Sequence, residues 1–284
     1  MRQFNDFDLT MYNSYRIKAI GKSVFFPDNE LDIINLFEQS TDYILLGSGH
    51  NVILSSEFYD KPIIIFNGNF NDIAVNEQDE LMVEAGAMMQ DVAEVALKWG
   101  LSGVEIFYDI PSSLGGAVVM NAGASGEEIK DVLIRVRYLD LADMVVKEIS
   151  KEDMSFEYRN SFFQRNTDKI VLKAWLKLRL EEKDKIQKKM DYIKEQRWAK
   201  QPKEFPNAGS VFKRPKGFYV GAIIDELQLK GFTVGGAKIS EKHGGFIVNF
   251  NNAKGMDIIN LISEVKVLVF DRFGLDLEIE QRII

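Results

Sequence analysis

Two stretches of the sequence are rich in glycine and small polar residues, a composition that suits binding of a flat or anionic ligand. The longer one, Gly103 to Gly126, reads GVEIFYDIPSSLGGAVVMNAGASG and holds five of the 21 glycines. The shorter one, Gly47 to Asn51, reads GSGHN and follows a short apolar segment. Glycine lets a ligand approach the backbone closely, and successive N–H groups can bind phosphate oxygens. One such stretch equally fits a tightly packed helix–strand junction, but two favour a long ligand with a phosphate part and a planar part.

Charged and hydroxyl side chains that could act on a substrate follow these loops. Arg159 lies in FEYRNS, and Ser210 ends a third loop of small residues, NAGS. A guanidinium is a permanently charged, planar donor that suits a carboxylate. Taken alone, Arg159 is also compatible with a structural ion pair, Ser210 with a turn cap, and Glu280 with a surface salt bridge.

Composition excludes several classes of protein. The chain has 284 residues and a formal net charge of −8, which argues against a nucleic-acid partner. It has no cysteine and only two histidines, so disulfides and thiolate chemistry are excluded and we predict no metal site. No apolar run reaches the roughly 20 residues of a membrane helix, and the N-terminus lacks a signal-peptide core. These features predict a soluble, acidic, cytoplasmic protein without a membrane partner.

Hydrophobic periodicity predicts helices and strands that alternate along the chain. Helices are expected over 30–39, 90–99, 181–200, 217–227 and 257–273. Strands are expected over 43–46, 52–54, 63–66, 81–85, 132–139, 170–180, 246–250 and 277–284, whereas residues 1–29 read as mixed loop and short strand. The second helix should bury Val92, Val95, Ala96 and Trp99, and the last should bury a stripe of Ile258, Leu261, Ile262, Val265, Leu268 and Val269. The pattern is typical of an α/β protein.

Six segments, in this order, carry a resemblance to a known family: GSGHN, SGVEIFYDIPSSLGGAVVMNAGASG, FEYRNSFF, NAGSVFKRP, LKGFTVGGAKISEKHGGFIVN and FGLDLEIEQRII. Together they resemble the UDP-N-acetylenolpyruvoylglucosamine reductases, flavoenzymes of peptidoglycan precursor synthesis. The resemblance covers nearly the whole chain. The short interval between Arg159 and Ser210, and Arg214 after VFK, are similar to the type II form of the enzyme.

The resemblance implies an α/β (α+β) fold in three parts. Two FAD-binding subdomains similar to the vanillyl-alcohol oxidase class should comprise residues 1–67, joined by the C-terminal strand 275–284, and residues 68–180. A separate α/β substrate-binding domain should comprise residues 181–274. The resemblance further implies a monomer.

The resemblance also implies an activity and a set of site residues. The activity is NADPH-dependent, FAD-mediated reduction of UDP-N-acetylglucosamine enolpyruvate to UDP-N-acetylmuramate, that is, an UDP-N-acetylmuramate dehydrogenase. Arg159 and Glu280 match the residues that stabilise charge on the substrate, and Ser210 matches the proton donor. Residues that match the FAD site are Gly47, Ser48, Gly49, His50, Asn51, Pro111, Ser112, Ser113, Gly115, Gly116, Asn121, Ala122, Gly123 and Gly126. Lys213, Arg214 and Lys238 are candidates for the substrate phosphates, although isolated basic residues are often solvated.

Two departures from the family pattern leave alternatives open. Ser112 stands where the family usually has glycine, so its backbone must have a negative φ or the loop must shift. His50 stands in the phosphate loop, where histidine bonds covalently to the flavin in some oxidases of the wider class; the alternative is a polar loop residue. The remaining functional alternatives are an FAD-dependent oxidase or dehydrogenase on another substrate, and a non-catalytic flavin- or sugar-nucleotide-binding paralogue.

Overall fold

The structure is a computed structural model that describes residues 1–76 and 78–284. The chain forms two compact units. Unit 1 comprises Met1–Phe4, Val24–Ser48 and Pro62–Gln196, and unit 2 comprises Asn5–Ser23, Gly49–Lys61 and Arg197–Ile284. Within the described ranges, no helix is both long enough and apolar enough to cross a membrane. The three-part division implied by the resemblance stays a prediction.

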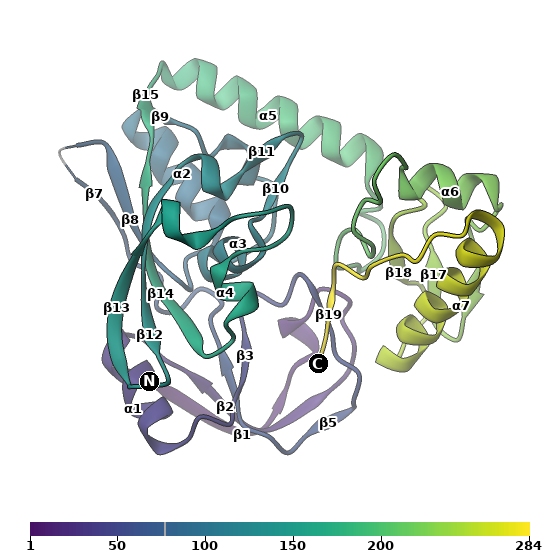
Figure 1. Cartoon of the computed structure of the whole chain (residues 1–284), viewed down its shortest axis with the longest axis horizontal. Helices are drawn as coiled ribbons and strands as arrows, with labels where there is room; N and C mark the ends of the chain where they lie inside the picture. The colour runs from purple at the N-terminus through teal and green to yellow at the C-terminus, as the bar shows by residue number, and fades with distance from the viewer. Residues whose placement is uncertain (77) are drawn as a thin grey trace. The chain divides into compact units, whose positions relative to one another are not determined.

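Unit 1 is built on an antiparallel sheet of five strands in the order β13-β12-β14-β8-β7 (Figure 1). Its strands are β7 (Ile73–Val75), β8 (Glu80–Glu84), β12 (Leu133–Asp140), β13 (Val145–Ser150) and β14 (Lys169–Lys177). Ala174 of β14 pairs with Val136 of β12 on one side and with Val83 of β8 on the other, and all three are fully buried. The alternation of apolar and polar residues in β14 therefore places one face of the sheet in the core of unit 1.

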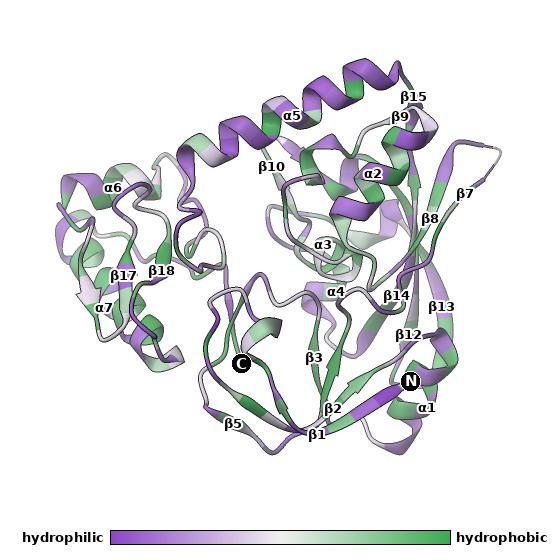
Figure 2. Ribbon diagram, turned by 180° about the vertical axis from the view of Figure 1, so that it is seen from behind, coloured by the Kyte–Doolittle hydropathy of each residue, from purple (hydrophilic) through white to green (hydrophobic). Residues whose placement is uncertain are grey.

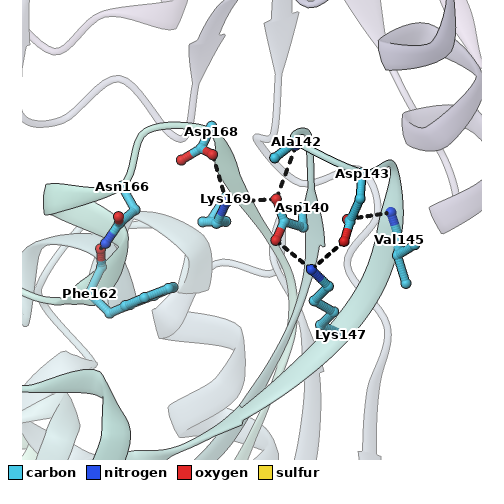
Figure 3. A network of polar contacts seen from close by, with 9 residues as sticks. All are labelled: Asp140, Ala142, Asp143, Val145, Lys147, Phe162, Asn166, Asp168 and Lys169. Atoms are coloured by element: carbon cyan, nitrogen blue, oxygen red, sulfur yellow. Dashed lines mark hydrogen bonds and ion pairs between the residues drawn. The ribbon is translucent and has the colours of Figure 1, made fainter.

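A network of charges joins three strands of this sheet where β12 ends (Figure 3). The Asp140 carboxylate accepts from Lys147 Nζ of β13 at 2.7 Å and from Lys169 Nζ of β14 at 2.6 Å. The same carboxylate accepts from the backbone N–H of Ala142 at 3.0 Å, which closes the β12–β13 turn. These hydrogen bonds, led by the one from Lys147, hold the pKa of Asp140 well below its ordinary value, and they raise the pKa of Lys147.

Replacing Asp140 with asparagine is expected to lower the melting temperature at neutral pH, because both lysines lose their shared carboxylate. A carboxyl whose pKa is depressed by folding stabilises the protein above its unfolded pKa of about 4, and this contribution disappears as the pH falls. The difference in melting temperature between the unaltered protein and Asp140→Asn should therefore shrink in acid. Thermal unfolding followed by circular dichroism between pH 3 and pH 7 measures it. Asp168→Asn, which removes a single exposed partner of Lys169, is the control and should have the smaller effect.

Helices of unit 1 pack on the sheet and position the glycine-rich stretch. They are α2 (Met89–Trp99), α3 (Leu114–Met120) and α4 (Phe162–Arg165); short strands β9 (Leu101–Ser102) and β15 (Arg179–Leu180) pair with each other, as do β10 (Gly123–Ala124) and β11 (Glu127–Glu128). Helix α3 contacts both β14 and β8. The expected burial of Trp99 is wrong, since its side chain is 58% exposed. The helix ends at Trp99, the chain turns at Gly100 with φ 68°, and the buried Leu101 completes the apolar stripe instead.

A second sheet contains parallel strands. It has the order β1-β2-β6-β3, with β5 also paired to β2, and its strands are β1 (Arg2–Asp8), β2 (Ile20–Phe26), β3 (Ile44–Leu46), β5 (Phe58–Tyr59) and β6 (Ile63–Ile65). Strand β6 runs parallel to both β2 and β3, and its three isoleucines are buried. A strand between two parallel neighbours is covered on both faces, which explains the uninterrupted apolar run. The predicted helix over 30–39 is α1 (Glu30–Gln39), capped by the Asn29 side chain, which accepts from the Asp32 N–H.

Unit 2 combines an antiparallel sheet with two helices. The sheet has the order β16-β17-β18, with β16 (Thr233–Val234), β17 (Ala237–Ile239) and β18 (Ile247–Asn249), and the helices are α6 (Val220–Glu226) and α7 (Gly255–Phe273). The apolar stripe predicted for α7 is buried except at Leu268, which is 39% exposed. At 3.6 residues per turn, Leu268 lies roughly 80° from the centre of the stripe. It is therefore at the edge of the apolar face, where side chains become exposed. Helix α5 (Lys183–Lys200), most of which belongs to unit 1, is largely hydrophilic (Figure 2) and buries Ile186 and Met190.

The C-terminal segment forms less strand than predicted. Of residues 277–284, only β19 (Arg282–Ile283) is a strand, and it pairs in parallel with β4 (Val52–Ile53). The residues before it bond to the segment that follows Ser210: the Lys213 N–H donates to the Glu278 carbonyl and the Glu280 N–H donates to the Val211 carbonyl. The segment therefore changes its bonding partner within a few residues, which shortens each ladder.

Candidate functional site

The residues predicted for the site divide between the two units. Unit 1 holds Gly47, Ser48, Pro111, Ser112, Ser113, Gly115, Gly116, Asn121, Ala122, Gly123, Gly126 and Arg159. Unit 2 holds Gly49, His50, Asn51, Ser210, Lys213, Arg214, Lys238 and Glu280. The chain itself passes from unit 1 to unit 2 inside the loop GSGHN, between Ser48 and Gly49.

Within unit 1 the two glycine-containing stretches touch each other. The Ser48 hydroxyl, in a buried residue, accepts a hydrogen bond from the Ser113 N–H at 3.1 Å. A Cβ added to Gly47 would lie 2.7 Å from Ser113 Oγ, closer than side-chain atoms approach one another. Two loops more than sixty residues apart thus pack against each other through small groups, and a side chain at Gly47 would clash with Ser113.

The glycines of the longer stretch serve different purposes. Gly123 is required by packing, because a Cβ there would lie 2.1 Å from the Glu127 carbonyl oxygen inside the β10–β11 pair. A Cβ on Gly115 would lie 3.2 Å from the Ala85 carbonyl oxygen, a tight contact between α3 and the sheet. Gly126, with φ +91°, has no atom within 4 Å of the added Cβ, so the turn conformation alone explains it. Packing or turn conformation thus accounts for these three glycines, and a ligand-binding role for them stays a prediction.

Asn121 ends α3 and ties the stretch to the FEYRNS segment. Its backbone adopts the left-handed conformation with φ 44°, and its side chain is fully buried. The Asn121 amide donates to Glu128 Oε2 at 3.1 Å and to the Glu157 carbonyl at 2.9 Å. The Asn121 side chain thus stabilises the loop by joining it to two other segments of the chain.

Arg159 is held against the same stretch. Its guanidinium donates to the Gly123 carbonyl at 2.8 Å and to the Asn121 carbonyl at 3.4 Å, and lies over the Tyr158 ring at 5.0 Å. Its backbone is left-handed, with φ 54°, a conformation that costs a non-glycine residue free energy. Backbone carbonyls thus hold the Arg159 guanidinium beside the glycine-rich stretch, and its charge-stabilising role stays a prediction.

Ser112 fits the loop without a left-handed backbone. It does not appear among the described residues with positive φ, so the loop accepts serine without the strain that a glycine conformation would impose. Its hydroxyl oxygen is buried and has no hydrogen-bond partner in the described part of the chain. A buried hydroxyl without a partner is unfavourable by about 1–3 kcal/mol, so this atom is suited to a ligand.

Within unit 2, the rest of the GSGHN loop contacts the N-terminal and C-terminal segments. Gly49, with φ +73°, is confined by the Tyr12 carbonyl, whose oxygen would lie 2.0 Å from an added Cβ. The Asn51 side chain donates to the Glu280 carbonyl at 3.2 Å, and the Arg282 N–H donates to the Asn51 carbonyl. The structure therefore brings the predicted phosphate loop and the predicted catalytic Glu280 together. His50 is half-buried, and its covalent attachment to a flavin stays a prediction.

Ser210 and Glu280 lie on adjoining segments of unit 2. The Glu280 N–H donates at 2.8 Å to the carbonyl of Val211, the residue after Ser210. Ser210 is exposed, and its loop is held from within by the Asn207 side chain, which accepts from the Gly209 N–H at 3.1 Å. The structure thus places the two residues on backbone segments that are hydrogen-bonded to each other, and their catalytic roles stay predictions.

The predicted substrate-binding cations have aromatic or acidic neighbours. Lys213 forms an ion pair with Glu278, and Lys238 forms one with Glu241 at 3.0 Å. Lys238 Nζ also lies 4.0 Å from the centre of the Phe250 ring, and the Arg214 guanidinium lies 3.7 Å from the centre of the Tyr219 ring. Both lysines therefore have acidic partners in the protein and are not isolated, and a role in substrate binding stays a prediction.

Two polar residues at this site escaped the sequence analysis. Tyr15 and Gln281 are buried and hydrogen-bonded to each other across a separation of 266 residues. A hydrogen bond between such distant residues leaves no recognisable pattern in the sequence around either of them. The one available indication was a glutamine in a terminal segment that otherwise alternates apolar and charged residues.

Comparison with known proteins agrees with this geometry. Residues 22–150 match the family described as FAD binding domain, and residues 201–284 match the family described as UDP-N-acetylenolpyruvoylglucosamine reductase, C-terminal domain. Fold and site thus define an FAD-binding α/β protein. The UDP-N-acetylenolpyruvoylglucosamine reductase of Francisella tularensis subsp. tularensis is 40% identical over 278 residues, which cover 97% of this chain and 98% of the relative. The chain belongs to the UDP-N-acetylenolpyruvoylglucosamine reductase family.

Further relatives support the same assignment. The reductase of Caldanaerobacter subterraneus subsp. tengcongensis is 38% identical and matches 96% of this chain and 90% of its own length. The crystal structure of the reductase from Thermus caldophilus superposes with a TM-score of 0.83 at 30% identity, covering 99% of this chain and 98% of that one. The predicted family, the α/β fold class with an FAD-binding part, and the flavin-dependent oxidoreductase class are therefore confirmed.

Proposed function

We propose that the chain catalyses the NADPH-dependent reduction of UDP-N-acetylglucosamine enolpyruvate to UDP-N-acetylmuramate in peptidoglycan synthesis. The observation that carries this proposal is the match to reductases over nearly the whole of both chains. The sugar-nucleotide substrate follows from the relatives' name. The cytoplasmic location and the monomeric state stay predictions.

The residues of unit 1 fit an FAD cofactor. The Ser112 hydroxyl, buried and without a partner in the described part of the chain, is suited to a hydrogen bond with a bound ligand. We propose that unit 1 holds the cofactor through Gly47, Ser48, Pro111, Ser112, Ser113, Gly115, Gly116, Asn121, Ala122, Gly123 and Gly126. A contribution from Gly49, His50 and Asn51 of unit 2 stays a prediction. When bound, FAD supplies the two-electron transfer from NADPH to the substrate.

The protein's own residues supply charge and a proton. Reduction of the enolpyruvyl group places negative charge on the substrate carboxylate while one carbon is still to be protonated. The Arg159 guanidinium is suited to that carboxylate, because it is planar, permanently charged and already fixed by the Gly123 carbonyl. In unit 2, Ser210 delivers the proton to the carbon, and Glu280, on the adjoining segment, stabilises the charge on the substrate.

One experiment tests the whole proposal. The purified protein, loaded with FAD, is reduced anaerobically by NADPH, and the enolpyruvyl sugar nucleotide is then added while the flavin absorbance is followed. We expect bleaching by NADPH and recovery on addition of the nucleotide, with UDP-N-acetylmuramate as the product. Recovery with oxygen but not with the nucleotide would identify an oxidase, and bound flavin that NADPH does not bleach would identify a non-catalytic binding protein.

Replacing Ser112 with alanine is expected to have opposite effects on the two states of the protein. The FAD-free protein should melt at a higher temperature, because a buried hydroxyl without a partner is removed. FAD affinity should fall by up to about tenfold, the equivalent of one lost hydrogen bond. Isothermal titration with FAD and thermal unfolding of the FAD-free protein measure the two effects.

The adjacent serine is a matched control. Ser113 caps α3 by accepting from the Gly116 N–H at 3.4 Å, so Ser113→Ala should lower the melting temperature of the FAD-free protein. If Ser112→Ala changes neither melting temperature nor FAD affinity, its hydroxyl has no role toward the cofactor.

A further inference from the structure

The side chain of Gln281 uses both of its polar ends inside unit 2. Gln281 is 4% exposed, and its Oε1 accepts from the Tyr15 hydroxyl at 2.9 Å. Its Nε2 lies 3.0 Å from the carbonyl of Ala208, 3.3 Å from that of Gly209 and 3.4 Å from that of Ser210. One buried amide therefore faces three consecutive carbonyls of the loop that ends in Ser210.

The direction of this amide is fixed by its partners. Carbonyl oxygens only accept, so the NH₂ group must face the loop and Oε1 must face Tyr15. The Tyr15 hydroxyl must then be the donor, and it stays protonated because burial raises its pKa well above the ordinary value. Removing Tyr15 Oη would take away the group that holds the amide in this orientation.

Tyr15 is itself anchored at its backbone. Its carbonyl accepts from the Asn249 side chain at 2.8 Å, and Asn249 Oδ1 accepts from the Ala253 N–H at 2.8 Å. The ring of Tyr15 has no exposed surface. Gln281 is therefore held by a residue that cannot move without disturbing the core of unit 2.

Hydrogen bonds set the conformation of Gly209, which precedes Ser210 in the loop. Gly209 adopts φ +77°, and no atom lies within 4 Å of the position its Cβ would take, so packing does not determine its conformation. The Gly209 N–H donates to Asn207 Oδ1, and its carbonyl accepts from Gln281 Nε2. The next residues are held by a β-bridge between Ser210 and Phe246 and by the Val211 N–H, which donates to the Gly245 carbonyl. A buried amide is unfavourable unless it is hydrogen-bonded, so an apolar residue of the same size would suit this core if packing alone mattered.

Gln281 also follows Glu280 in the chain. The Glu280 backbone is fixed by the Val211 carbonyl and by the Asn51 side chain. Gln281 is thus covalently next to one proposed catalytic residue and hydrogen-bonded to the loop of the other. A change in the Gln281 side chain would shift the Ser210 loop relative to Glu280.

We propose that Gln281, oriented by Tyr15, is a positioning residue that sets the Ser210 hydroxyl relative to Glu280 for protonation of the substrate. This inference rests on the proposed function, in which Ser210 is the proton donor. Gln281 acts through the backbone of residues 208–210 and touches no reacting atom.

The test separates the two half-reactions of the FAD-loaded protein. Gln281→Met keeps the size of the side chain and removes its hydrogen bonds, and Tyr15→Phe removes only the hydroxyl that orients it. We expect bleaching of the flavin by NADPH at an unchanged rate in both variants. Recovery on addition of the enolpyruvyl nucleotide should be about 10- to 100-fold slower in Gln281→Met, the effect of a misplaced reacting group, and less slowed in Tyr15→Phe. The double variant should be no slower than Gln281→Met, because both changes break one network.

Controls distinguish positioning from general destabilisation. Gln90→Met, at an exposed position of α2, should leave both half-reactions unchanged. Equal slowing of both half-reactions, or normal recovery in Gln281→Met, would overturn the inference. If Gln281→Met does not fold, Tyr15→Phe decides alone: normal recovery there also overturns it. Normal recovery in Ser210→Ala would instead overturn the assigned role of Ser210, whereas loss in Ser210→Ala with normal recovery in Gln281→Met would refute the positioning role alone.

Discussion

Replacing Ser210 with alanine is expected to slow recovery of the flavin absorbance by the enolpyruvyl nucleotide by ~10²–10⁴-fold, the usual contribution of a positioned proton donor. The exposed hydroxyl at the end of the NAGS loop is the one that the proposal assigns to protonation, and alanine removes the proton without changing the backbone. Bleaching by NADPH should continue at its normal rate, because that half-reaction needs no proton from Ser210. Stopped-flow absorbance under anaerobic conditions measures each half-reaction separately.

A second serine of unit 2 provides the control for this result. Ser263 on α7 donates to the Ile259 carbonyl at 2.9 Å and is outside the proposed site, so Ser263→Ala should leave both half-reactions unchanged. If Ser210→Ala recovers at a rate near that of the unaltered protein, Ser210 is not the proton donor, and Glu280 becomes the residue to test.

Replacing Gly49 with alanine is expected to prevent stable folding or to abolish FAD retention. The added Cβ would lie 2.0 Å from the Tyr12 carbonyl oxygen and 3.1 Å from the Asn13 Cα, both backbone atoms that cannot rotate away. The loop would have to separate from the N-terminal segment, which is also bonded to it through the Ser14 N–H and the Gly49 carbonyl. Soluble yield, melting temperature and the ratio of flavin to protein measure the outcome.

Gly68 is a matched control because it has the same φ of +73° but no atom within 4 Å of an added Cβ. Gly68→Ala should therefore lose only the roughly 1–2 kcal/mol of left-handed backbone strain and should retain FAD. If the two variants behave alike, the confinement of Gly49 by Tyr12 is not important for the fold.

The sequence predicted those elements whose hydrophobic pattern is local and complete. Helices α1, α2, α5 and α7 lie within a few residues of their expected ranges, because an apolar face and end signals such as Asn29 and Gly100 are readable from neighbouring residues. Strand β6 was equally clear, since three consecutive isoleucines suit a strand buried on both faces.

Elements whose stability comes from distant partners were harder to predict. Strand β1 is almost entirely exposed, and β13 is at most half-buried, so neither carries a clear alternation. Their backbone hydrogen bonds to β2 and β12 define them, and those partners are not encoded in the local pattern. The predicted burial of Trp99 was wrong because α2 ends at this residue, and the position of a helix end is hard to read from the apolar pattern alone.

The candidate site shows the same division. The two glycine-rich stretches were predicted separately, and the contact between Ser48 and Ser113 joins them in unit 1. The structure also distinguishes glycines that look alike in the sequence, since a Cβ on Gly123 would meet the Glu127 backbone whereas one on Gly126 would have no atom within 4 Å. The bond between Tyr15 and Gln281 was not predicted, because the two residues are 266 positions apart and Tyr15 lies in none of the quoted segments.

The two units are interleaved along the chain. The boundaries after residues 4, 23, 48, 61 and 196 mean that the polypeptide passes from one unit to the other five times. Cutting after residue 196 would leave unit 1 whole but would deprive unit 2 of its longest piece. Unit 2 can therefore be completed only after the last third of the chain has been synthesised, which makes its closure a late event in folding. To obtain either unit alone, its segments would have to be joined by new connections. No contiguous stretch contains unit 2 without most of unit 1.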